Sequence, residues 1–144
     1  MIIVFKIVVG LVVANLYEWI IHKYILHMVG KRKNSFWKFH WSDHHSQCRK
    51  NNNHDTTVYK KELLALSLLV ILHLPLLYVD IIFLTTVVAY AILYYTIHRY
   101  AHTHPEWGKK HLRWHWDHHM GKNQDANWCI LFPMWDHILN TREK

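Results

Sequence analysis

The sequence predicts an all-α integral membrane protein with about three transmembrane helices and a cytosolic, histidine-rich helical cap. Three apolar runs support the first part, because each is long enough to cross a hydrocarbon core of roughly 30 Å at about 1.5 Å per residue. The histidines support the second part. Most of the 15 lie at the ends of these runs or in the polar segments beside them.

With 144 residues, the chain is expected to form a single domain, residues 1–144, around one core. Its mean hydropathy is close to zero, which is typical of a soluble protein, yet 51% of its residues are hydrophobic. The two values agree because long apolar runs alternate with dense polar stretches. An average over the whole chain therefore hides the membrane segments.

The first expected span covers residues 2–21 and carries only two charged side chains, Lys6 and Glu18. A cleaved signal peptide is the alternative, but the run lacks a basic leading region and is followed by no clear cleavage site of small residues. The run also leads directly into a histidine motif. We expect the segment to be retained as a transmembrane helix.

The second and third expected spans are residues 63–79 and 81–98, separated by Asp80. Together they are too long for one crossing and suit a tight helical hairpin with Asp80 at the turn. Pro75 is expected to kink the second span, which membrane helices tolerate.

Three spans place residues 22–61 and 98–144 on the same side of the membrane. Of the 17 Lys and Arg residues, all except Lys6 fall in these polar stretches or directly beside them. Positive charge is typical of the cytosolic side, so this side is predicted to face the cytosol. No basic nucleic-acid motif accompanies the charge, so nucleic-acid binding is not expected. Cys48 and Cys129 form no paired motif and are interpreted as ordinary thiols.

Four histidine boxes lie on this predicted face: HKYILH, HWSDHH, HRYAH and HWDHH. Histidines four residues apart share one helix face, and neutral imidazole is the commonest metal ligand in proteins. Ten imidazoles exceed the four ligands of a single structural ion and suit a pair of metals with open positions. The candidate ligands are His22, His27, His40, His44, His45, His98, His102, His115, His118 and His119.

Polar residues beside the boxes are candidates for holding the ligands in place. Asn15 and Glu18 form a polar stripe with His22, and Glu18 is expected to accept the free ring N–H of His22 because a carboxylate within a span needs a partner. Tyr94 lies one turn before His98 on the third span, where an aromatic interface belt is the alternative. Asp117 precedes a histidine pair and is interpreted either as ligand support or as a solvated charge.

The remaining histidines are weaker candidates. His73 is expected to be hydrogen-bonded within the helix bundle, and His54 lies in a polar loop. Three others are considered only as neighbours of the site: His104, His111 and His137.

The four boxes resemble those of the fatty acid hydroxylase/sterol desaturase superfamily. The tail NWCILFPMWDHILNT, residues Asn127 to Thr141, is similar to the closing segment of that family. The first box also resembles that of the small bacterial carotenoid hydroxylases. The resemblance implies a non-haem enzyme that uses two iron ions, replaceable by zinc, with O2 and two electrons. It assigns the ten box histidines as metal ligands and no catalytic residue beyond them.

The resemblance further implies hydroxylation or desaturation of a lipid such as a fatty acyl chain or sterol. The alternatives are a carotenoid ring hydroxylase, a non-catalytic metal-binding or transport protein, and a membrane haem protein. The chain is shorter than most eukaryotic members and has three spans where four or more are usual. It has no fused cytochrome domain, so a separate donor of the ferredoxin or cytochrome b5 type is expected. The expected location is the bacterial inner membrane or the endoplasmic reticulum.

Overall fold

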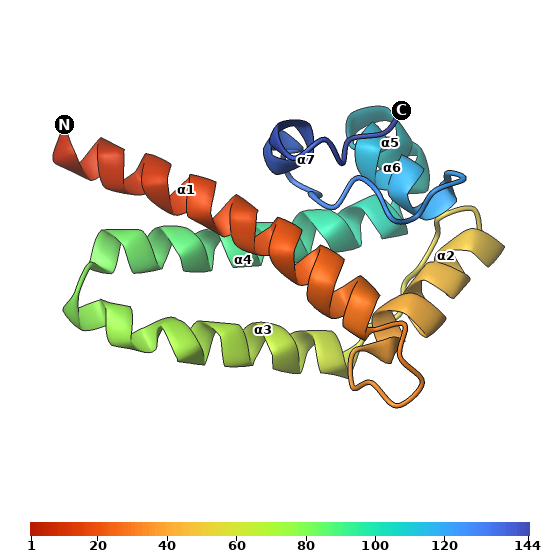
Figure 1. Cartoon of the computed structure of the whole chain (residues 1–144), viewed down its shortest axis with the longest axis horizontal. Coiled ribbons are helices and arrows are strands. Elements are labelled where there is room, and N and C mark those ends of the chain that lie inside the picture. The colour runs from red at the N-terminus through yellow and green to blue at the C-terminus, as the bar shows by residue number, and fades with distance from the viewer.

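A computed structural model describes all residues 1–144 and contains helices and turns but no strand (Figure 1). The elements in chain order are α1 (Ile2–Ile20), η1 (Ile21–Val29), η2 (Phe39–His45), α2 (Ser46–Lys50), α3 (Lys60–His73), η3 (Leu74–Tyr78), α4 (Ile81–Thr103), α5 (Pro105–His111), α6 (Arg113–Met120) and α7 (Met134–Ile138). The all-α prediction is confirmed.

Three helical stretches are long and apolar enough to cross a membrane: Ile2–Val29, Lys60–Tyr78 and Ile81–Thr103. The first is α1 continued by the π-helix η1, and the second is α3 continued by the 3₁₀-helix η3, which contains Pro75. The first and third run beyond the predicted ends at residues 21 and 98. Both helices are longer than predicted because the box histidines at these ends are themselves helical.

The turn between the second and third spans lies at the end of the bundle opposite the histidines. Asp80 caps α4, accepting from the backbone N–H groups of Ile82 and Phe83 at 3.1 Å each. Its carboxylate also pairs with Lys6 near the start of α1, with 2.7 Å between Lys6 Nζ and Asp80 Oδ2. The polar segments 22–61 and 98–144 consequently lie together at the other end (Figure 1).

The spans pack unequally against one another. α1 lies against α4, and a Cβ added to Gly10 would meet the Thr86 side chain at 2.9 Å, so glycine permits the close approach of these two helices. α3 has no buried residue. It stands apart from α1, and this separation leaves a cavity inside the bundle.

Most of the buried apolar side chains gather around the histidine cap, and fewer lie deep within the spans. One cluster joins Trp19 to Trp128 and Cys129, and a second joins Ala101, Leu112 and Ile130. Both clusters bring the tail segment after α6 against the histidine ends of α1 and α4. The fold therefore builds its core around the predicted site.

Candidate metal centre

All ten box histidines are buried, with at most 5% of each residue exposed. They come from four elements: η1 supplies His22 and His27, η2 supplies His40, His44 and His45, α4 supplies His98 and His102, and α6 supplies His115, His118 and His119. The structure thus brings together all ten histidines that the boxes identify as candidate ligands.

The first two boxes are wound as π-helices, and their spacing explains why. His22 and His27 are five residues apart, which on an α-helix would place them about 140° from one another. In a π-helix the hydrogen bonds join residues five apart, so such residues lie nearly on one face. His40 and His45 have the same separation in η2. The π-helical winding therefore directs both pairs into the same interior.

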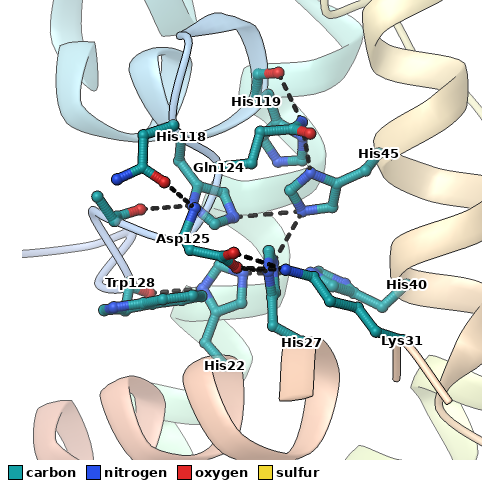
Figure 2. A network of polar contacts seen from close by, with 12 residues as sticks. His22, His27, Lys31, His40, His45, His118, His119, Gln124, Asp125 and Trp128 are labelled. Carbon is teal, nitrogen blue, oxygen red and sulfur yellow. Dashed lines mark hydrogen bonds and ion pairs between the residues drawn. The ribbon is translucent and has the colours of Figure 1, made fainter. Parts of the chain in front are cut away.

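The ten imidazoles form two neighbouring sets. In the first set, the ligand atoms lie within 4.8 Å of one another: His22, His27, His40, His45 and His118 (Figure 2). Four histidines of the second set meet the same limit: His44, His98, His102 and His119. His115 adjoins this second set, because its Nε2 lies 3.0 Å from His102 Nε2. The rings of His45 and His119 stack at 4.2 Å where the sets meet.

Backbone carbonyls fix the tautomers of three of these rings. The Nδ1 atoms of His22 and His118 contact the carbonyl oxygens of Trp128 and Ala126 at 2.5 and 2.7 Å (Figure 2). His102 Nδ1 lies 3.1 Å from the Asn53 carbonyl. A carbonyl oxygen only accepts, so each Nδ1 carries the hydrogen and each neutral ring presents a lone pair at Nε2.

The Nε2 atoms of His22 and His118 each face the Nε2 atom of another imidazole. His22 Nε2 lies 3.1 Å from His40 Nε2, and His118 Nε2 lies 3.2 Å from His45 Nε2. Further buried ring nitrogens have no hydrogen-bond partner, among them His44 Nε2 and both nitrogens of His119. Buried polar atoms are normally paired. Cations bound between the rings would satisfy these nitrogens, so the residues fit metal ions.

The protonation state agrees with this role. For five box histidines outside the spans, burial lowers the pKa well below the ordinary value, and neighbouring imidazoles lower it further: His40, His45, His115, His118 and His119. These rings are neutral near pH 7. Neutral imidazole is the form that binds a metal ion.

The tail after α6 carries the two carbonyls that orient the first set. Asp136, which is fully buried, accepts from the backbone N–H groups of Trp128 and Cys129 at 2.9 and 2.8 Å. Its carboxylate also accepts from the Thr141 hydroxyl at 2.7 Å, and that hydroxyl accepts from the Trp19 indole. The Trp-Asp pair and the threonine of the tail therefore anchor this segment beside the histidines.

The prediction that Glu18 accepts the ring N–H of His22 is wrong. His22 uses the Trp128 carbonyl instead, because the tail segment packs against this face of α1. Glu18 accepts from the Tyr90 hydroxyl, the Ile130 and Leu131 N–H groups and Asn15 Nδ2. Asn15 also donates to the Phe132 carbonyl at 3.0 Å. Glu18 and Asn15 thus hold the tail, and they act on the ligands only through it.

The other two predicted supporting residues, Tyr94 and Asp117, make different kinds of contact. The Tyr94 ring lies against the His98 ring, with 5.6 Å between centroids, and faces the cavity. Asp117 accepts from Arg113 at 2.8 Å rather than from a histidine, so it forms a surface ion pair. His73 is hydrogen-bonded within its own helix, to the Leu69 carbonyl, as expected.

The weaker histidine candidates lie outside the site. His54, His104, His111 and His137 are all exposed, and none belongs to either histidine set. For the last three, the expectation that they neighbour the site is not supported by the structure.

Several polar contacts of the site are not apparent from the boxes. Asp125, held by Lys31 at 2.6 Å, lies 3.4 Å from His27 Nδ1. The Gln124 amide lies 3.1 Å from His45 Nδ1 and donates to the His119 carbonyl (Figure 2). Glu62 Oε1 lies 3.6 Å from His98 Nδ1. These residues are far from their histidines in sequence, so no spacing pattern could reveal the contacts.

A cavity of about 380 Å³ adjoins the first set, between α1, α3 and α4. Hydrophobic residues make up 16 of its 20 lining residues, and His22 and His40 belong to its wall. An apolar cavity that reaches a cluster of metal-type ligands can hold a hydrophobic molecule against them.

The fold and the site define an all-helical membrane protein with a buried histidine centre suited to metal ions. The family model for fatty acid hydroxylases matches residues 7–141, and the chain therefore belongs to the fatty acid hydroxylase family. No curated protein and no solved structure matches the chain. The family supports an oxidoreductase, in agreement with the resemblance carried by the boxes.

Proposed function

We propose that the protein is a membrane-bound di-iron oxygenase that hydroxylates or desaturates a C–H bond of a lipid such as a fatty acyl chain or a sterol, with O2 as co-substrate. The observation that carries this proposal is the set of facing Nε2 atoms beside an apolar cavity. Iron bound by imidazole supplies the oxygen chemistry, whereas zinc, which imidazole also binds, has no redox chemistry.

The ten histidines hold the ions, and their buried surroundings keep the centre dry. Three Nδ1 atoms are fixed by backbone carbonyls, so the corresponding Nε2 atoms remain directed inward without a proton. The apolar cavity walls exclude water from the lipid and from the histidines at the wall. His22 and His40 line the cavity, so a lipid held there would lie beside the first set.

The apolar cavity lies between helices that are long and apolar enough to span a membrane, so a hydrophobic substrate can enter it from the bilayer. A carotenoid ring hydroxylase is the second candidate, because the first box HKYILH resembles that of the small carotenoid hydroxylases.

We propose a separate protein of the ferredoxin or cytochrome b5 type as the electron donor. Basic residues are concentrated at the histidine end of the bundle, which favours an acidic donor through electrostatic complementarity. The same charge favours a cytosolic orientation of this end. The proposed location is the bacterial inner membrane or the endoplasmic reticulum.

Sidedness gives one expected result. A tag inserted at Asn52 and a tag at the C-terminus should both be accessible from the cytosol, and a tag before Met1 should be accessible only from the opposite side. Protease protection in sealed vesicles measures all three. A tag at Asn52 that is protected while the C-terminal tag is cleaved would contradict a shared histidine face.

The activity is tested by lipid and pigment analysis of cells that express the protein, grown with and without oxygen. The expected result is an oxygen-dependent product that has gained one oxygen atom or lost two hydrogens. Cells that express the His118→Ala variant should lack this product. A wild-type protein that retains iron and yet changes no lipid or pigment, with a donor supplied, would favour a non-catalytic metal-binding protein.

A further inference from the structure

The loop between α2 and α3, residues 51–59, contains no box histidine yet reaches into the site. Asn53 and Asp55 are buried, at 1% and 2% exposure, although the sequence NNNHDTTVY is polar. Asn52 and Asn53 have φ angles of 52° and 67°, in the left-handed region that asparagine tolerates better than most residues. The asparagine run thus reverses the chain so that it returns over the second histidine set.

The loop is attached to the turn of α4 that carries the third box. The Asp55 N–H donates to the His102 carbonyl at 3.2 Å. The Arg99 guanidinium donates to the carbonyls of Thr56 and Thr57. These bonds hold residues 55–57 in a constant position relative to the histidines of α4.

Two acceptors of this loop meet ring nitrogens of the second set. Asp55 Oδ2 lies 2.9 Å from His44 Nδ1, and the Asn53 carbonyl oxygen lies 3.1 Å from His102 Nδ1. Asp55 is itself held by the Tyr59 hydroxyl at 2.9 Å and by the Thr57 N–H at 2.8 Å. A carboxylate beside a histidine ligand commonly fixes its tautomer and orientation.

We propose that Asp55 and the Asn53 carbonyl are the positioning groups of the second histidine set, holding His44 and His102 with their Nε2 atoms toward a bound metal. This inference rests on the proposed metal centre and assigns the polar loop a role that the boxes do not reveal. His44 Nε2 is a buried atom without a hydrogen-bond partner, as the proposal requires.

A rival arrangement uses the same residues as a separate metal site. His44, Cys48 and Asp55 lie close enough together to hold an ion. The contacts favour the positioning role, because three donors already occupy the Asp55 carboxylate. The Cys48 Sγ also lies 3.4 Å from His102 Nδ1, which is the ring nitrogen opposite the Nε2 atom that faces the other imidazoles.

The test compares Asp55→Asn and Asp55→Ala with the wild type in a chelator titration that counts the iron retained by the detergent-purified protein. Asp43→Asn is the matched control, because Asp43 adjoins His44 in sequence but is exposed and accepts only from Ser42. In Asp55→Ala, one of the two ions should be released at an approximately 10–100-fold lower chelator concentration. Asp55→Asn keeps an acceptor for His44 and should recover part of the affinity. Circular dichroism of the iron-free proteins checks that the helices remain.

Three results would overturn the inference. If the wild type binds two ions and both Asp55 variants release them at the wild-type concentration, the positioning role fails while the proposed function stands. If the wild type binds three ions and Asp55→Ala binds two, the rival metal site is correct. If the wild type itself binds fewer than two ions, the proposed function fails and this inference fails with it.

Discussion

Replacing His102 by alanine is expected to remove the metal ion of the second set and to abolish turnover. His102 is fully enclosed, its Nδ1 is held by the Asn53 carbonyl, and its Nε2 lies 3.0 Å from His115 Nε2. Loss of a residue that supports a ligand typically costs about 10–100-fold in metal affinity or activity. Loss of the ligand itself should exceed this range. Iron content and product formation by the purified variant measure the effect.

His104 provides the matched control, because it follows His102 by two residues, at the end of α4, and is exposed. Its ring stacks on Tyr100 with 4.1 Å between centroids, away from both histidine sets. His104→Ala should therefore keep wild-type iron content and activity. Equal losses in the two variants would contradict the distinction between ligands and bystanders.

Replacing Asp136 by alanine should cause the largest loss of stability outside the histidines. The buried N–H groups of Trp128 and Cys129 would lose their acceptor, and the Thr141 hydroxyl would lose a partner. An unsatisfied buried donor costs about 1–3 kcal/mol, so the two N–H groups alone imply about 2–6 kcal/mol. Thermal unfolding of the iron-free protein in detergent measures this loss.

Iron binding should also weaken in Asp136→Ala, because the Trp128 carbonyl that orients His22 belongs to the same segment. Asp136→Asn retains one acceptor oxygen and should lie between alanine and the wild type. Asp117, whose side chain is 17% exposed and pairs with the exposed Arg113, supplies the control substitution Asp117→Asn, which should be close to neutral. An unchanged melting temperature in Asp136→Ala would show that the tail does not anchor the site.

The spans and the convergence of the boxes could be predicted because both follow from patterns along the chain. Apolar length identifies the helices, and the two crossings between HKYILH and HWDHH place these boxes on the same side. The π-helical winding of η1 and η2 was not predicted, although the five-residue spacing of His22 and His27 contains the signal. Read with an α-helical period alone, that spacing separates two residues that the structure brings together.

The supporting contacts could not be predicted, because they join residues without any periodic relation. Glu18 and His22 share a helix face, yet both bind the tail more than a hundred residues away in sequence. Asp55 reaches His44 only because the asparagine turn reverses the chain. Sequence spacing predicts which ligands converge, whereas tertiary packing decides which carbonyl or carboxylate holds each ring.

The central claim, that two sets of histidines hold two metal ions, is tested most directly by the iron-to-protein ratio of the wild type. The protein would be purified in detergent, loaded with ferrous iron without oxygen, and desalted to remove weakly bound metal. Two dense imidazole sets predict a ratio of about two, since a single site uses about four protein ligands. A ratio near zero, or a ratio near one under saturating iron, would contradict the two-metal account.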